Sequence, residues 1–488
     1  MGRTHDGAKA RLTAAGAAIE HALKPRYLGI GFLWAWIYCS FETSALYPDR
    51  QGISINADPS WLASAGTVVV VLIATGIAWR NLDLERARWT HFTAPALVAT
   101  GTVLSAIASS LEPPPTALQY ASGILSGVGS GWLCILWADA LSRLDVERIE
   151  VVVPAASVVT LLCSLVFPSI QGIPGVAAVA LLPLASGALL LLSYRDKMPN
   201  PAAASEAALA RTRDGGVMRT VLRASVVLCI AYFAIGFMGA MDGSKGIAAM
   251  LGGFDIPAFI GSVFGIVMAL CFVLYTVRID FASLFRWLVP LLVLALALLP
   301  WKAMAPAFIA DTIASVADTS MQVITYIYII GLARKRLLPA ALGIGLAQGF
   351  LQLGVLAGNV AGAQAASQVA VGQLNVFVLV LGLICLVSFS ALLVPQRAAK
   401  PVDRTPASCD EGGAPRIELR CSRLAREGGL SNREAEILVY LAKGRSQPYI
   451  REELFLSKNT VATHVKHIYQ KLNVHSRQEL LDLFDEKS

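Results

Sequence analysis

Charged residues are scarce in this sequence. Asp, Glu, Lys and Arg make up only 15% of the 488 residues, whereas hydrophobic residues make up 56%. Soluble globular domains carry about 25% charged residues, and a chain of this length exceeds one compact soluble domain. The composition therefore excludes a single soluble domain and predicts a protein that crosses a membrane several times.

Metal, redox and catalytic motifs are also missing. The eight cysteines contain no CxxC spacing, and six of them lie in apolar runs, where a thiol behaves as a small hydrophobe. The other two, Cys409 and Cys421, fall in a polar segment, and none of the six histidines pairs with a cysteine at ligand spacing. No nucleophile–base pair, phosphate loop or secretory signal is evident. We therefore expect no enzyme, no cofactor, no metal site and no disulfide.

Twelve apolar runs are long enough to cross a bilayer, which requires about 20 residues for each helix. The longest internal loop, Tyr194 to Thr220, is polar and divides these runs into two groups of six. We predict an all-α membrane domain over 28–394, preceded by a cytoplasmic N-terminal segment, 1–27. The predicted spans lie near 28–47, 61–79, 93–111, 117–139, 150–168, 173–193, 221–241, 256–276, 284–300, 304–332, 338–362 and 372–394.

Lys and Arg are distributed unevenly over the segments between these runs. If the N-terminus is cytoplasmic, the inner segments hold 21 of them and the outer segments hold 3, namely Arg50, Lys245 and Lys302. Basic residues are enriched on the cytoplasmic side of membrane proteins. Because the number of spans is even, we predict that both termini are cytoplasmic, with the chain in the inner membrane of a bacterial cell.

This layout, two groups of six spans around a basic central loop, resembles the major facilitator superfamily. The resemblance covers about 28–394 and lies in the layout rather than in a motif. The family's loop between spans two and three combines a Gly, an Asp and basic residues, whereas the loop here, 80–88, has the charges without the Gly. The matching loop, 278–286, departs further. The resemblance implies a transporter fold, and these departures argue against transport as the function.

Several polar residues lie inside the predicted spans. An ionisable group at bilayer depth costs several kcal/mol unless it is paired or hydrated, so such residues indicate functional sites. Asp318 lies midway along its span and shares a helix face with Asp311, two turns earlier. Glu42 lies in the outer part of span one, close to several aromatic residues. The candidate ligand-sensing residues are Glu42, Asp311, Asp318, Gln322, Gln348 and Gln352.

Two roles fit these residues. A central cavity lined by aromatic residues and a few acids suits a small, flat or cationic organic ligand, and the lack of a basic residue at the midplane disfavours an anion. Alternatively, the polar groups hold the bundle together through hydrogen bonds between helices. For Gln348, Gln352, and the tryptophans Trp132 and Trp137, packing is the favoured account.

The composition changes at Pro395. The segment 395–422 holds four prolines and the pair Gly412-Gly413, and we predict that it is a flexible linker. A flexible chain of this length spans roughly 30 Å. The chain from Pro395 onward holds 16 basic and 13 acidic residues. It must therefore concentrate its positive side chains on one face in order to bind DNA.

Four short helices are predicted in the remaining domain, 423–488. Ser431-Asn-Arg-Glu434 is a capping box, in which the hydroxyl and the carboxylate satisfy the free amides of a helix start. The helix that it opens presents Ile437, Leu438 and Leu441 on one stripe. The others run from Ser446 or Gln447 to about Leu454, from the cap Ser457 to Leu472 with Val461, Val465 and Ile468 inward, and from Arg477 to Phe484.

The outward side of the third helix has the composition of a DNA-contacting surface. Thr hydroxyls near a helix N-terminus favour phosphate contact, and the residues that follow reach base edges in the major groove. A solvated basic face on a small helical bundle is the alternative. The predicted DNA-binding residues are Lys458, Thr460, Ala462, Thr463, His464, Lys466, His467 and Lys471.

The segments 430–438, 454–461 and 463–477 resemble the LuxR-type helix-turn-helix domain. The resemblance covers about 423–488 and implies DNA binding, with the last helix as the dimer contact. Arg451 and Pro448 depart from the family, which has a small Ala and a charged residue at these positions. The resemblance places Ala462, Thr463 and Lys466 against bases, and Thr460, His467 and Lys471 near phosphates.

Together these features suggest a membrane-embedded one-component transcription regulator. In this hypothesis the membrane domain senses an unknown small molecule, and the tail binds double-stranded promoter DNA as a homodimer, with RNA polymerase as a further candidate partner. The alternative is a major facilitator-type transporter with an appended regulatory domain. A third hypothesis, in which the tail binds protein, is the least favoured. The sequence gives neither the ligand nor the operator.

Overall fold

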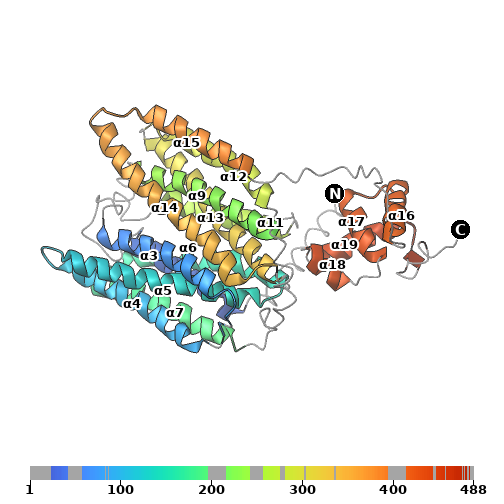
Figure 1. The fold of residues 1–488 in the computed structure, drawn as a ribbon, viewed down its shortest axis with the longest axis horizontal. Helices are drawn as coiled ribbons and strands as arrows, with labels where there is room; N and C mark the ends of the chain where they lie inside the picture. The colour runs from blue at the N-terminus through green and yellow to red at the C-terminus, as the bar shows by residue number, and fades with distance from the viewer. Residues whose placement is uncertain are drawn as a thin grey trace. The chain divides into compact units, whose positions relative to one another are not determined.

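The computed structural model describes residues 24–41, 58–82, 84–85, 87–195, 216–241, 256–274, 281–301, 304–334, 337–393, 414–442, 447–454, 456, 458–474, 476, 479–480 and 483. Every regular element in these residues is a helix, as predicted (Figure 1). The chain separates into two compact units after Gln396, and each unit is described by itself.

Among its described residues, the first unit contains twelve helices of at least 13 residues, six before and six after the segment 196–215 in the sequence. By length and composition, nine of the helices in the described residues are able to cross a membrane. The first group is α2 (Gly29–Phe41), α3 (Pro59–Ala78), α4 (Arg88–Ser110), α5 (Thr116–Ser142), α6 (Val146–Val166) and α7 (Gly172–Ser193). The second group is α9 (Gly216–Met241), α11 (Ile256–Leu274), α12 (Phe281–Leu298), α13 (Met304–Arg334), α14 (Ala340–Ala370) and α15 (Val376–Ser390).

Glycines allow helices of this unit to pack backbone against backbone. Gly354, Gly358 and Gly362 recur at every fourth position of α14 and therefore share one face, which packs against α9. A Cβ atom at Gly358 would collide with the carbonyl oxygen of Phe233. In lipid, where neighbouring helices gain little from the hydrophobic effect, close van der Waals packing of this kind holds them together.

A second glycine contact joins the two groups of helices. Gly76 of α3 and Gly345 of α14 lie against each other, so that a Cβ atom at Gly345 would collide with the carbonyl oxygen of Leu72 and the Cα atom of Gly76. The contact requires glycine because a side chain at this position would push the backbones apart. The two groups therefore meet closely along α3 and α14.

Buried ion pairs occupy the C-terminal end of α5. Arg143, whose side chain is 6% exposed, binds the carboxylates of Asp139 and Glu85. The hydroxyl of Tyr194 donates a hydrogen bond to Asp139 at 2.9 Å. A buried arginine is tolerated when carboxylates and further hydrogen bonds compensate for its lost hydration. Asp139, which the sequence places near the inner end of span four, is therefore part of a structural network.

The same region links the two groups of helices a second time. Arg334, at the C-terminal end of α13, donates to the backbone carbonyl of Arg143 at 3.2 Å and to the carboxylate of Asp145 at 3.0 Å. Asp145 lies in the short connection between α5 and α6. We call the contacts of Arg334 with Arg143 and Asp145 the α13 latch.

The second unit is a small helical domain with its own core. It consists of α16 (Ala414–Glu427), α17 (Asn432–Ala442), α18 (Gln447–Leu454) and α19 (Lys458–Lys471). The ends of α17, α18 and α19 agree with prediction to within about two residues. The predicted last helix lies mostly outside the described residues. The core contains Cys421, Ile437, Leu438, Leu441, Ile450, Leu454, Leu456, Val461, Val465, Ile468, Val474 and Leu480.

Helix α16 differs from the sequence-based expectation. It begins at Ala414, so residues 414–422, which we expected to be part of a flexible linker, are helical. The turn after it uses Gly429 at φ +58°, and the amide of Leu430 bonds the carbonyl of Ala425 at 2.8 Å. This is a glycine-dependent helix end. The prolines and glycines before Ala414 concealed the helix, because they disfavour regular structure only locally.

Candidate functional sites

A cavity of about 520 Å³ lies between the two groups of helices in the first unit. Its described lining residues come from α2, α3, α5 and α6 of the first group and from α9, α11, α13 and α14 of the second. Helices α4, α7, α12 and α15 contribute none of them. A ligand in this cavity would therefore contact both groups at once.

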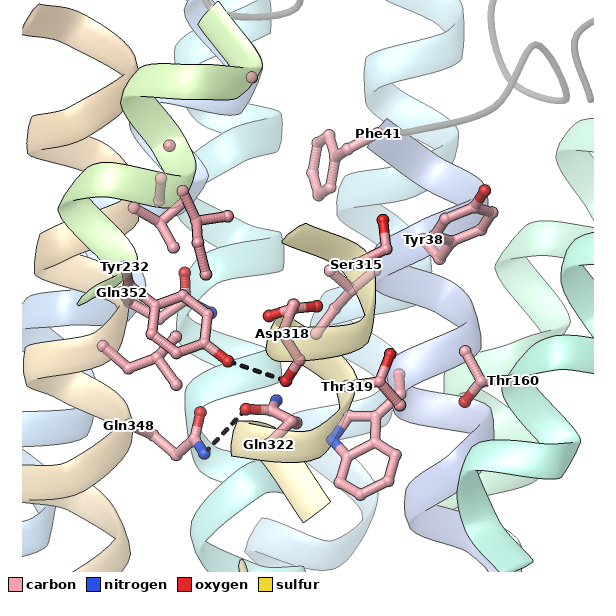
Figure 2. A pocket seen from close by; sticks show the side chains of 18 of the residues that line it. Tyr38, Phe41, Thr160, Tyr232, Ser315, Asp318, Thr319, Gln322, Gln348 and Gln352 are labelled. Atoms are coloured by element: carbon pink, nitrogen blue, oxygen red, sulfur yellow. Dashed lines mark hydrogen bonds between the residues drawn. The ribbon is translucent and has the colours of Figure 1, made fainter. Parts of the chain in front are cut away.

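One face of α13 provides the acidic side of the cavity. Asp311, Asp318, Gln322 and Tyr326 all line it, and Asp311 and Asp318 lie on the same side of the helix, as expected from their spacing. Asp318 lies in the middle of the view in Figure 2, and its backbone carbonyl accepts a hydrogen bond from the hydroxyl of Tyr232 on α9 at 3.3 Å. The described lining residues include no Lys, Arg or His. The described lining residues of the cavity thus include two carboxyl groups and no basic side chain.

Hydrogen bonds between helices connect other polar lining residues. The amide of Gln348 on α14 donates to the side-chain carbonyl of Gln322 on α13 at 3.4 Å (Figure 2). The thiol of Cys134 and the hydroxyl of Tyr326 lie 2.9 Å apart and join α5 to α13. Gln348 is only 2% exposed. These contacts fit the expected packing role for Gln348, although the same residue also borders the cavity.

Aromatic side chains of α2 form a second side of the cavity. Trp34, Tyr38 and Phe41 line it at a helical spacing of three to four residues. The ring of Trp34 contacts that of Tyr326 edge to face, with centroids 5.1 Å apart. Tyr38 and Phe41 lie across the cavity from Tyr232 in Figure 2. The acidic wall and the aromatic wall thus belong to different groups of helices.

Some of the lining residues were predicted from the sequence, and others were not. Gln352 lines the cavity as well, whereas Glu42 lies outside the described residues. Ser315 and Thr319 follow the spacing of the Asp311–Gln322 face, so the helical period contained the signal that would have found them. Tyr232 and Thr160 were missed because they come from other helices, and the sequence does not say which helices are neighbours.

The buried side of α19 agrees with prediction. Val461, Val465 and Ile468 are at most 4% exposed and belong to the core of the second unit. Arg433 on α17 donates to the carbonyl of Leu454, the last residue of α18, at 2.8 Å. This bond fixes the end of α18 against α17. The helix pair α18 and α19 is thereby held in a helix-turn-helix arrangement.

The opposite side of α19 faces solvent. Five of the predicted DNA-binding residues are exposed there, while Thr460 and His464 are half-buried and the side chain of Lys458 lies outside the described residues. The turn after α19 contains Asn473, whose φ of 53° is a left-handed conformation that Asn tolerates. The exposed residues are Ala462, Thr463, Lys466, His467 and Lys471.

Glu434 connects the capping box to α19. Its carboxylate accepts a hydrogen bond from the amide of Ser431 at 2.7 Å, and the Ser431 hydroxyl accepts one from the amide of Glu434 at 3.3 Å, which confirms the capping box. The carboxylate also binds the ammonium of Lys471 at 2.7 Å and lies 3.6 Å from the His467 ring. Lys471 thus has an internal partner in addition to its predicted place near phosphate.

These contacts set the protonation of Glu434. Burial of the carboxylate opposes its ionisation, but the hydrogen bonds from Lys471 and Ser431 outweigh that effect and lower its pKa to about 2. The neighbouring His464 has a pKa below the usual value, mainly because it is partly buried and also because Arg433 and His467 are close. Its Nδ1 atom is buried without a hydrogen-bond partner among the described residues. Partial burial thus favours the neutral form of His464.

Comparisons with known proteins agree with the geometry of the second unit. Residues 429–484 match the family described as bacterial regulatory proteins, luxR family. The chain is 49% identical over 53 residues to the Fimbriae Z protein of Salmonella typhimurium, a match that covers 11% of this chain and 25% of that protein. It is 35% identical over 104 residues to the transcriptional regulatory protein LiaR of Bacillus subtilis, a match that covers 19% of this chain and 48% of that protein. The chain spans about a quarter of the length of the first of these relatives.

The first unit is similar to solved transporter structures. The human organic anion transporter MFSD10 (TETRAN) superposes with a TM-score of 0.53 at 14% identity, covering 76% of this chain and all of that one. A bacterial homologue of the iron transporter ferroportin in an outward-facing state gives a TM-score of 0.53 at 14% identity. The match covers 77% of this chain and 98% of that one. These likenesses show the fold. The chain thus joins a helical bundle with the fold of these transporters to a helix-turn-helix domain. That helix-turn-helix domain, residues 429–484, is of the luxR family.

Proposed function

We propose that this protein is a membrane-embedded one-component transcription regulator. In this proposal the twelve-helix bundle binds a small molecule in the central cavity, and the C-terminal domain binds promoter DNA as a homodimer. The observation that supports it most is the presence, in one chain, of a luxR-family DNA-binding domain and a bundle with a cavity bordered by both groups of helices. RNA polymerase is a further partner in this proposal.

The distribution of basic residues supports a defined orientation. With 21 Lys and Arg in one set of connecting segments and 3 in the other, both termini lie in the cytoplasm, and the bundle spans the inner membrane. The DNA-binding domain then lies on the side of the membrane that contains the chromosome. Because the two domains belong to one chain, we expect the protein to bind only DNA that approaches the membrane.

The predicted DNA-binding residues divide into two classes in this proposal. Ala462, Thr463 and Lys466 are exposed on α19 and contact base edges, and Thr460 contacts phosphate. Lys471 and His467 lie beside Glu434, so their contribution to phosphate contact competes with an internal ion pair.

A substitution at Lys466 tests DNA binding by the tail. Lys466→Ala removes an exposed cation from the proposed base-contacting surface, and we expect its affinity for promoter DNA to fall about tenfold or more, because one good base contact contributes about 1–3 kcal/mol. The matched control is Arg426→Ala, which removes an exposed cation from α16. Binding is measured with full-length protein in nanodiscs. Unchanged affinity of the Lys466 variant would favour a protein-binding tail.

A transporter with a regulatory tail is the second candidate function. The specific observation in its favour is the cavity that both groups of helices border, as alternating access requires. Uptake into proteoliposomes distinguishes the two functions. We expect no saturable transport of any compound that changes DNA binding, and robust saturable transport of one such compound would favour the second candidate.

A further inference from the structure

The walls of the cavity differ in chemistry, and this difference indicates which class of ligand fits the cavity. The acidic wall is the face of α13 with Asp311 and Asp318, and the aromatic wall is the face of α2 with Trp34, Tyr38 and Phe41. We infer that the cavity binds a small organic cation with a flat aromatic ring, its positive charge paired with Asp318 and its ring placed against the aromatic wall. This inference rests on the proposed function, because it names the ligand class for the same cavity.

The charged groups of the cavity favour a cationic ligand. A carboxylate at bilayer depth is costly unless an opposite charge or water compensates for it. No Lys, Arg or His is present among the described lining residues. A ligand with a positive charge would stabilise the ionised form of Asp318, whereas an anion would oppose it. Asp318 lies between Tyr232 of α9 and Tyr38 of α2 in Figure 2, so a ligand paired with it can contact both groups of helices.

The aromatic wall favours a ligand with a flat ring. Rings of Trp, Tyr and Phe attract cations through their negative faces and stack with flat ligands, and the attraction is larger where water is excluded. Trp34 is 9% exposed and is held edge to face against Tyr326, which fixes its orientation. An aliphatic cation would use only part of this surface. A ligand with a flat ring uses all of it.

The amide groups of the cavity argue against a sugar or other neutral polyol. Such a ligand needs many free hydrogen-bonding groups, yet Gln322 and Gln348 bond each other across the α13–α14 contact. The Thr160 hydroxyl donates to the backbone carbonyl of Gly31 at 3.1 Å. Several neutral polar groups therefore already have partners within the protein. Charge and aromatic surface remain the main chemical features that the cavity offers.

Both walls are engaged only when one ligand contacts both groups of helices. The aromatic wall belongs to α2 in the first group, and the acidic wall belongs to α13 in the second. A ligand that pairs with Asp318 and stacks on α2 thus favours the bundle state in which these walls are close. A ligand shifts a conformational equilibrium only through such differential contact.

A size-matched set of flat bicyclic probes tests the ligand class. The cation 1-methylquinolinium, the neutral 1-methylnaphthalene and the anion 1-naphthoate have similar size and shape and differ in charge. Equilibrium dialysis measures their binding to full-length protein in nanodiscs, with protein-free nanodiscs to subtract lipid partitioning. We expect saturable binding of 1-methylquinolinium, with an affinity at least about tenfold above that of the other two.

Two variants locate the binding. Asp318→Asn retains the size of the side chain and removes its charge, and we expect it to weaken 1-methylquinolinium binding at least about tenfold. Phe41→Leu removes a ring from the aromatic wall and should weaken the cation several-fold. The control Glu112→Gln removes an exposed acid between α4 and α5, outside the cavity, and should leave binding unchanged. Equal affinities for the three probes, or an unchanged affinity in the Asp318 variant, would overturn the inference.

The same preparations separate this inference from the proposed function. Promoter binding by wild-type protein and by Lys466→Ala measures the function directly, without any ligand. If promoter DNA binds through Lys466 but the cation does not bind at Asp318, the ligand class is wrong and the regulator function stands. If the cation binds at Asp318 and promoter DNA does not bind, the ligand class stands and the regulator function is wrong.

Discussion

Glu434 shows how one residue in the DNA-binding domain serves two helices. Its carboxylate completes the capping box of α17 and also holds Lys471 near the end of α19. At 4% exposure it is buried, and a buried carboxylate stabilises the fold only while it is ionised and bonded. Glu434 therefore links the start of α17 to the end of α19, beside the apolar contacts that pack α19 into the core.

This arrangement predicts a pH dependence of stability. The folded-state pKa of Glu434, about 2, is below the usual value of 4.5, so its contribution is fully present above about pH 4.5 and is lost as the pH falls through about 2. We expect the free energy of unfolding of a 414–488 fragment to fall by about 3 kcal/mol over this window relative to Glu434→Gln. Urea unfolding at several pH values measures it, with Glu427→Gln as the control. Parallel curves for wild type and Glu434→Gln would contradict the assignment.

Residues that interact within one helical turn were predicted well, and residues that interact across the chain were not. The capping box of Ser431 and Glu434 was found because its members are three positions apart. The partner of that carboxylate, Lys471, is 37 positions away and was assigned only to phosphate. Asp318 was found as a charge inside an apolar span, but its neighbour Tyr232 is 86 positions earlier and carries no such signal.

At the scale of elements, the contact between α3 and α14 is the feature that sequence alone does not reveal. Apolar length predicted both helices, but their adjacency depends on Gly76 and Gly345, which lie 269 residues apart in sequence. Because these helices belong to different groups, the contact holds the two groups of the bundle together along one line. Helix α16 was not predicted for a different reason. It is a local element, but the prolines and glycines next to it in the sequence indicated a linker.

A larger residue at Gly345 should separate these two helices. In Gly345→Val the added side chain meets backbone atoms of Leu72 and Gly76, which cannot move aside as a side chain does. We expect faster hydrogen exchange at residues 69–76 and 341–349 and a lower melting temperature. The control Gly66→Val lies on α3 where no atom lies within 4 Å of the added Cβ, and it should behave as wild type. Identical exchange in both variants would mean that the contact tolerates side chains.

At the scale of the whole molecule, the proposed function assigns sensing to the bundle and DNA binding to the helix-turn-helix domain that follows it in the chain. Hydropathy and basic-residue counts predicted the two-part organisation, because each part has a distinct composition. The likeness to transporters shows the fold of the bundle and does not assign it transport. What distinguishes a sensor from a transporter here is whether the state of the bundle changes DNA occupancy.

The most direct test of this central claim is promoter occupancy by the full-length protein in cells. Arg334→Ala breaks the α13 latch between the two groups of helices, whereas the control Arg80→Ala removes an exposed cation from the loop after α3. Occupancy is mapped by chromatin immunoprecipitation, with Lys466→Ala as the baseline. We predict that Arg334→Ala changes occupancy severalfold at the sites bound by wild type, at equal protein level in the membrane, while Arg80→Ala does not. Occupancy that is the same in wild type and Arg334→Ala would contradict the account.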